Sequence, residues 1–260
     1  MTSPRKKYII ANWKMNFTPG EASLYLSRLS RRIDTGRNLQ IVLAPSLVAL
    51  QTLSLQINRR QFKLAAQNFY WRDYGAYTGE VSVSQLRGFV DYALVGHSER
   101  RYVFNESDKD IQEKVAAAIR NNITPVLCIG ETTLERKDGE TNRAIHNQLI
   151  EGLHLVSKED IDKVIIAYEP VWAISSNKNA KPAKPADIDA AVKIIRSHIG
   201  KLYGKEIGEN ISVLYGGSVN ADTAGGYLDI EGIDGLLVGG ASLIADSFCA
   251  IVETAKGKNK

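Results

Sequence analysis

Short apolar segments alternate with longer amphipathic segments along the chain. Eight apolar segments, rich in β-branched residues, each have the length of one buried strand. They cover residues 8–11, 41–44, 64–66, 92–95, 125–129, 164–168, 212–215 and 235–238. Between them, apolar residues recur at helical spacing, most clearly over residues 21–33, 111–119, 142–156, 186–203 and 241–255. Pro19 precedes the first of these helices, and a capping box from Ser107 to Asp110 precedes the second.

Eight strand–helix units in 260 residues predict an α/β protein whose parallel eight-stranded sheet closes into a (β/α)8 barrel. A doubly wound open sheet is the alternative. Such a sheet usually carries a glycine-rich dinucleotide fingerprint after its first strand, whereas here Asn12-Trp-Lys-Met-Asn16 follows. No linker or change of composition divides the chain. Residues 1–260 are therefore expected to form one barrel domain, with flexible ends at 1–6 and 256–260.

The composition is that of an ordinary globular protein, with 44% hydrophobic and 24% charged residues. Much of the net charge of +4 lies near the two ends of the chain, which indicates solvated termini and no nucleic-acid partner. Cys128 and Cys249 do not suggest a disulfide framework, and no apolar run has the length of a signal or membrane segment. A cytoplasmic protein without a membrane partner is expected.

In a barrel, the chemistry is expected just beyond the carboxyl ends of the strands. There the sequence brings a carboxylate, an imidazole, an ammonium group and several glycines. They belong to Asn12, Lys14, Gln67, Asn68, residues 96–99, Gly130, Glu131, Glu169, residues 216–218, Gly239 and Gly240. Glu169 is the candidate general base, because Pro170 holds it in extended backbone at a strand end beside a long polar loop. A structural ion pair is the alternative role for Glu169.

Five of these segments resemble the signature segments of the triosephosphate isomerase family. They are residues 12–16, 96–101, 168–174, 215–219 and 239–243, in the family's order, and the similarity covers about residues 8–254. The resemblance implies interconversion of dihydroxyacetone phosphate and D-glyceraldehyde 3-phosphate through an enediolate, as in glycolysis and gluconeogenesis, without cofactor or metal. Two alternatives stay open, an aldolase-like phosphosugar enzyme acting through Lys14 and a non-catalytic phosphate-binding barrel.

The resemblance also implies a role for each catalytic side chain. Glu169 would move the carbon-bound proton, and His97 would polarise the carbonyl and carry protons between the oxygens. Residues 98–100 read as the first turn of a helix, whose positive end would keep His97 neutral. Lys14 would supply positive charge facing the substrate, and Glu99 would orient Lys14.

Backbone N–H groups beside glycines would bind the phosphate. The substrate-binding set implied by the resemblance is Asn12, Lys14, Ser175, Ser218, Gly239 and Gly240. The loop after Glu169 would close over the substrate as a lid. Its tip departs from the family, which usually has Gly-Thr-Gly where this chain has Ser175-Ser176-Asn177, and an extra proline follows within residues 181–185. We therefore expect a lid with altered closing kinetics.

Residues 67–80 form a long and unusually aromatic segment. The resemblance implies a homodimer in which this loop inserts into the partner subunit, with Thr78 near Asn12 of the partner subunit. A loop folded onto its own barrel is the alternative. The remaining histidines, at positions 146, 154 and 198, are interpreted as solvated residues with no metal ligand set, and Cys128 is interpreted as a small buried residue.

Overall fold

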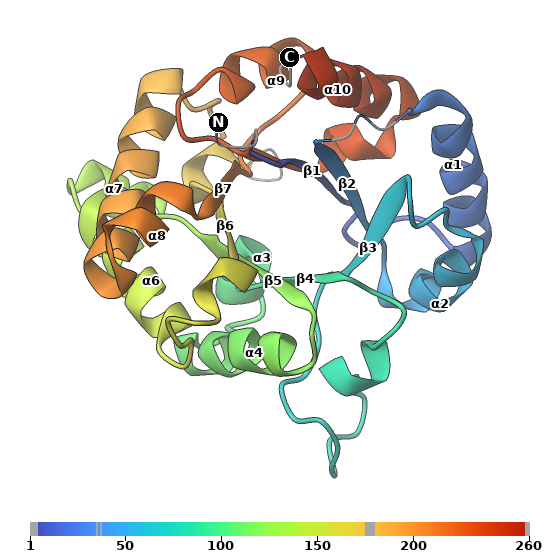
Figure 1. The fold of residues 1–260 in the computed structure, drawn as a ribbon, viewed down its shortest axis with the longest axis horizontal. Helices are drawn as coiled ribbons and strands as arrows, with labels where there is room; N and C mark the ends of the chain where they lie inside the picture. Colours follow the sequence, from blue (N-terminus) through green and yellow to red (C-terminus); the bar gives the residue numbers. More distant parts are fainter. Residues whose placement is uncertain (1–4, 35, 37, 175–179, 258–260) are drawn as a thin grey trace.

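Eight parallel strands close into a barrel in the computed structural model, which describes residues 5–34, 36, 38–174 and 180–257 (Figure 1). The strands pair in chain order, and β8 pairs with β1 to complete the ring. They are β1 (Lys7–Asn12), β2 (Leu39–Ala44), β3 (Phe62–Ala66), β4 (Tyr92–Val95), β5 (Thr124–Ile129), β6 (Ile165–Tyr168), β7 (Ser212–Tyr215) and β8 (Gly235–Val238). The predicted (β/α)8 barrel is confirmed, and the alternative prediction of an open, doubly wound sheet is wrong.

The helices surround the barrel (Figure 1). They are α1 (Pro19–Arg32), α2 (Leu47–Gln56), α3 (Ser98–Tyr102), α4 (Asp108–Arg120), α5 (Thr133–Lys137), α6 (Thr141–Leu153), α7 (Pro185–Tyr203), α8 (Lys205–Asn210), α9 (Ala221–Leu228) and α10 (Ala245–Gly257). Single 3-10 turns are η1 (Val83–Leu86), η2 (Ile161–Lys163), η3 (Val171–Ala173) and η4 (Gly240–Leu243). None of the helices within the described ranges combines the length and the apolar content that crossing a membrane requires.

The helix starts follow the signals in the sequence. Thr18 caps α1, which has Pro19 in its first turn, and the Ser107 hydroxyl and the Asp110 carboxylate form the predicted capping box of α4. The last predicted helix differs from the structure at both ends. It begins at Ala245 because Gly240–Leu243 form a separate turn, and it continues to Gly257, two residues into the segment expected to be flexible.

Apolar side chains pack in two places. One cluster lies between the strands and the surrounding helices, and the other fills the inside of the barrel. The inner cluster consists of Ile10, Val42, Ala44, Ala65, Tyr92, Leu94, Val126, Cys128, Ile165, Ala167, Leu214 and Leu237. Side chains thus fill the inside of the barrel, and a substrate can bind only at its mouth.

Parallel pairing brings every strand's carboxyl end to the same mouth. Asn12 pairs with Ala44 at the end of β1, and Tyr168 pairs with Tyr215 at the ends of β6 and β7. The seam between β1 and β8 depends on Gly235, where an added Cβ would overlap the carbonyl group of Tyr8. The residues that follow each strand therefore face a common space.

Candidate active site

The candidate base and the candidate imidazole meet at the barrel mouth. Glu169 directly follows β6 and is 3% exposed, while His97 follows β4 and is 5% exposed. His97 Nε2 lies 3.3 Å from Glu169 Oε1. The other carboxylate oxygen, Oε2, is buried and has no hydrogen-bond partner among the described residues. Among the described residues no lysine or arginine nitrogen lies within salt-bridge distance of Glu169, and its charged-group contact is to His97.

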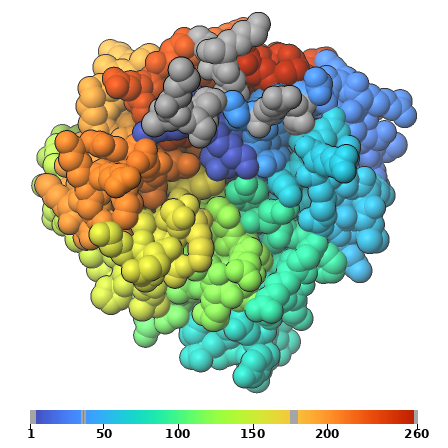
Figure 2. Space-filling view, in the orientation of Figure 1, coloured from blue at the N-terminus to red at the C-terminus, as the bar shows by residue number. Residues whose placement is uncertain are grey.

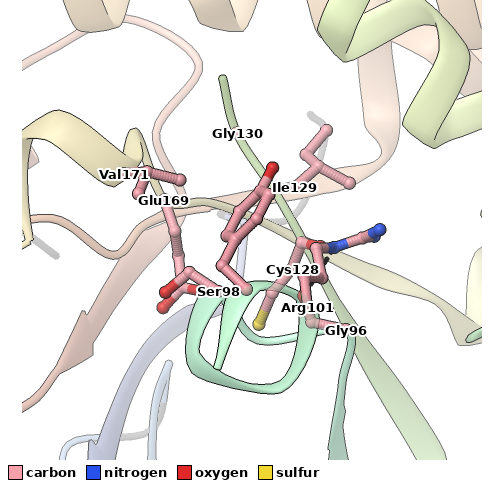
Figure 3. A pocket seen from close by; sticks show the side chains of 9 residues that line it. Gly96, Ser98, Arg101, Cys128, Ile129, Gly130, Glu169 and Val171 are labelled. Atoms are coloured by element: carbon pink, nitrogen blue, oxygen red, sulfur yellow. Dashed lines mark hydrogen bonds between the residues drawn. The ribbon is translucent and has the colours of Figure 1, made fainter. Parts of the chain in front are cut away.

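Glycines make the space that Glu169 occupies. An added Cβ at Gly216 would lie 2.7 Å from Glu169 Cγ, and one at Gly130 would overlap the Glu169 carbonyl. The backbone N–H of Glu169 donates to the Ile129 carbonyl over 2.7 Å, which extends the β5–β6 pairing to the base itself. Figure 3 shows the carboxylate directed towards the first turn of α3, beside Cys128. Burial, and then the nearby Glu169 carboxylate, raise the pKa of the Cys128 thiol well above its ordinary value.

The ring of His97 has a defined tautomer. His97 is the N-cap of α3, and its Nδ1 accepts a hydrogen bond from the Glu99 backbone N–H over 3.2 Å. A nitrogen that accepts cannot carry a hydrogen, so the neutral ring bears its hydrogen on Nε2, the atom that faces Glu169. The predicted first helical turn at residues 98–100 is confirmed by α3.

Lys14 is held in left-handed backbone, with a φ of 52°. This region is uncommon for a residue with a side chain and costs about 1–3 kcal/mol. Its N–H donates to Asn12 Oδ1 over 3.1 Å, and its carbonyl accepts from Gln67 Nε2 over 2.9 Å. The ammonium group lies 2.6 Å from Glu99 Oε1. The sequence placed Gln67 at a strand end but did not identify its role in holding Lys14.

A hollow of about 210 Å³ opens between Lys14 and His97. Its wall contains polar groups from three strand ends together with Met15 and Phe104, whose side chains are largely exposed. A second, much smaller cavity lies behind Glu169, lined by Gly96, Arg101 and Cys128 among others (Figure 3). We assign the larger hollow to the candidate active site, because both Lys14 and His97 line it.

The predicted phosphate-binding residues lie on neighbouring turns. Gly240 is the first residue of η4. The backbone N–H and the hydroxyl of Ser242 both donate to the Gly239 carbonyl, over 2.8 and 2.7 Å. Gly239 lies beside Lys14, since an added Cβ would be 3.6 Å from Lys14 Cε. The Ser218 N–H donates to the Ala173 carbonyl over 2.8 Å. Ser175, the remaining predicted phosphate-binding residue, lies outside the described residues.

Glu131 anchors the start of the loop that follows Glu169. This carboxylate is fully buried and accepts from Trp172 Nε1 over 2.8 Å and from the Tyr168 hydroxyl over 3.1 Å. Burial and the negative charge of Glu131 raise the pKa of Tyr168 well above its ordinary value. Arg136 stacks on the Trp172 ring at 4.0 Å. The position of Glu131 after a strand was the only signal of this role in the sequence.

Two of the remaining histidines meet in the fold, which the sequence did not predict. His198 Nδ1 lies 3.2 Å from His146 Nδ1. The two residues are on different helices and 52 positions apart, so only the packing of α6 against α7 brings them together. Cys128 is buried as interpreted, at 1% exposure.

Fold and site together define a (β/α)8-barrel enzyme with a carboxylate, an imidazole and an ion-paired lysine at the mouth. The family model described as triosephosphate isomerase matches residues 7–255. The chain is 42% identical over 249 residues to a protein of Caldanaerobacter subterraneus subsp. tengcongensis named triosephosphate isomerase, covering 95% of this chain and 99% of that protein. Proteins of the same name from Lactococcus lactis and Streptococcus mutans are 40% and 38% identical, each over 97% of this chain and 99% of the relative. The chain belongs to the triosephosphate isomerase family.

Gly216→Ala is expected to lower the kcat/KM of isomerisation by about 10²-fold, because the new methyl group displaces the Glu169 carboxylate from its working position. Steady-state kinetics measures the effect, and thermal unfolding shows whether the barrel stays folded. Gly226→Ala is the matched control, since an added Cβ there meets nothing within 4 Å. Equal kcat/KM for Gly216→Ala and wild type would contradict the assigned position of the base.

Proposed function

We propose that this chain interconverts dihydroxyacetone phosphate and D-glyceraldehyde 3-phosphate by proton transfer through an enediolate. The observation that carries the proposal is the 3.3 Å approach of His97 Nε2 to Glu169 Oε1 at the barrel mouth. Groups this close can act on adjacent carbons of one three-carbon substrate. Membership of the triosephosphate isomerase family supports the same reaction. We also expect the cytoplasmic location that the cysteine content indicates.

The chemistry divides between the base and two electrophilic groups. Glu169 takes a proton from the carbon next to the carbonyl and returns it to the neighbouring carbon. His97 donates from Nε2 to the carbonyl oxygen, and the same ring moves a proton between the two oxygens of the enediolate. Lys14, held by Glu99, stabilises the negative charge that develops on oxygen. Asn12, which is 5% exposed, holds the Lys14 backbone and faces the substrate.

The phosphate is bound at the turns after β7 and β8. Gly239 and Gly240 bring backbone N–H groups close to the anion at the start of η4. The Ser218 N–H is occupied by Ala173, so it becomes available to phosphate only when this bond opens. Ala173 belongs to the loop that follows Glu169. We infer that movement of that loop frees the Ser218 donor as the phosphate arrives, with Ser175 joining from the same loop.

The aldolase-like alternative requires a neutral amine at Lys14. The contact of Lys14 Nζ with Glu99 Oε1, 2.6 Å long, favours the ammonium form instead. Borohydride added with dihydroxyacetone phosphate is therefore expected to leave the chain unlabelled, as measured by intact-protein mass. An adduct on Lys14 would favour the aldolase-like reaction.

Glu169→Gln is expected to lower kcat/KM by about 10³–10⁴-fold, because the amide cannot accept the carbon-bound proton. A reporter dehydrogenase that consumes the product measures the rate. Glu135→Gln, on α5 and outside the site, is the control and should retain the wild-type rate. Equal rates for Glu169→Gln and wild type would overturn the isomerase proposal and favour the non-catalytic phosphate-binding barrel.

We further propose a homodimer formed through the loop of residues 67–80. This loop stands out from the barrel at the bottom of Figures 1 and 2. Its base is anchored by Asp73, which accepts hydrogen bonds from Asn121 and Arg120 at the carboxyl end of α4. These bonds lower the pKa of the Asp73 carboxylate. Its tip is not covered by the same barrel, since Tyr74 is 91% exposed. An exposed aromatic tip of this kind favours an interface over the folded-back alternative.

The receiving surface is the hollow beside Lys14. Met15 is 96% and Phe104 is 62% exposed, and both line this hollow next to Lys14 and Glu99. A loop from a second copy, with Thr78 at its tip, would cover these apolar side chains and approach Asn12 of the partner subunit. The dimer would then hold the strained Lys14 segment in its working conformation.

Thr78→Arg is expected to convert the dimer to a monomer and to lower kcat/KM by about 10²-fold or more, because a large charged side chain does not fit the partner's hollow. Analytical ultracentrifugation at several concentrations measures the assembly. Thr133→Arg, an equally exposed substitution at the start of α5, is the control. A variant Thr78→Arg that remains dimeric would contradict insertion of this loop.

A further inference from the structure

Two histidines on neighbouring outer helices form a pair that does not include any residue of the candidate active site. His146 lies on α6 and His198 on α7, which pack side by side (Figure 1). Their Nδ1 atoms are 3.2 Å apart, while the ring centroids are 4.5 Å apart. The nitrogens are therefore on the facing sides of the two rings. Both side chains are half-buried, so the pair is accessible to small solutes.

A third residue fixes the tautomer of the pair. His198 Nε2 lies 2.7 Å from Asn142 Oδ1, an oxygen that only accepts, so His198 carries its hydrogen on Nε2. His198 Nδ1 then has a free lone pair and accepts from His146 Nδ1–H. Burial, His146 and Lys201 lower the pKa of His198, which keeps that lone pair unprotonated at neutral pH.

We propose that His146 and His198 form a binding site for a divalent transition-metal ion of the Cu²⁺, Ni²⁺ or Zn²⁺ class. Such an ion binds imidazole nitrogens at about 2.0–2.1 Å, so nitrogens 3.2 Å apart meet it at an angle of about 100°, between the angles of a tetragonal and a tetrahedral site. The hydrogen of His146 moves from Nδ1 to Nε2, so both Nδ1 lone pairs become available to the ion as the two rings turn towards it, and no net proton is released. The Asn142 oxygen then supplies the outer hydrogen bond that metal-bound histidines usually make.

The remaining coordination positions belong to water. Across residues 5–34, 36, 38–174 and 180–257, no group of three or more His, Cys, Asp or Glu side chains is placed to hold a metal. A site with two protein ligands is exchangeable and favours Cu²⁺, the strongest binder of the divalent series. The ion would link α6 to α7, the helix that follows the lid segment, and would stabilise the native state by binding to it alone.

Copper binding to the EDTA-treated, dialysed wild-type protein tests the proposal directly. With less than one equivalent of CuCl₂ at neutral pH, the electron paramagnetic resonance spectrum is expected to show hyperfine coupling to two imidazole nitrogens. Calorimetric titration is expected to give one ion per chain, and the Tm is expected to rise with CuCl₂ but not with MgCl₂. A spectrum with a single coupled nitrogen would overturn the proposal without any variant.

Variants then identify the ligands. His146→Gln and His198→Gln are each expected to weaken Cu²⁺ binding at least tenfold, and Asn142→Ala by about 10–100-fold, because its loss frees the ring orientation. His154→Gln is the matched control, as His154 is exposed at the end of the same helix. Circular dichroism without metal checks that each variant is folded. Wild-type affinity in both His146→Gln and His198→Gln would place the copper elsewhere and refute the site.

Discussion

The structure depends on keeping one carboxylate, that of Glu169, buried at the mouth of a closed barrel. A buried carboxylate without a cationic partner is costly, and proteins usually pair or neutralise it. Here one oxygen faces His97 and the other has no partner among the described residues. Backbone pairing with Ile129 and the absent side chains of Gly130 and Gly216 hold it in place. The rest of the barrel therefore stabilises a buried group that is unfavourable by itself.

The same logic extends to Lys14 on the opposite side of the mouth. Its left-handed backbone is unfavourable locally, and it persists because Asn12 and Gln67 bind its two peptide groups. Asn12 belongs to β1 and Gln67 follows β3, so the strain is stabilised by two different strands. Barrel closure and site geometry are therefore linked, because a shift of β1 or β3 along its neighbour would move Asn12 or Gln67.

The sequence predicted the strands better than the contacts between their ends. The segments at 92–95, 212–215 and 235–238 coincide with β4, β7 and β8, because strands buried on both faces are short apolar runs. Helix α2 was not singled out, since it is apolar on all sides and lacks the polar face that marks an outer helix. Strand-end position and family resemblance found Glu169 and His97.

What the sequence did not predict has a common physical cause. The left-handed backbone of Lys14, the role of Gln67, the Glu131–Trp172 bond and the His146–His198 pair all depend on side chains brought together from separate elements. Helical and strand periodicity describe which face of an element is buried, but not which partner it meets there. Such contacts follow from the register of the closed sheet, which no single segment determines.

The bonds around the start of the loop that follows Glu169 differ in strength. Trp172 is fixed to the buried Glu131, so the loop has a rigid starting point. Beyond it, the Ser218–Ala173 bond and the bond from the Lys181 N–H to the Trp172 carbonyl are single neutral hydrogen bonds, each worth about 0.5–1.5 kcal/mol. In the proposed function, a substrate phosphate that gains charge-assisted bonds at the same turns would offset their loss. The exchange of the Ser218 donor would then couple movement of this loop to phosphate binding.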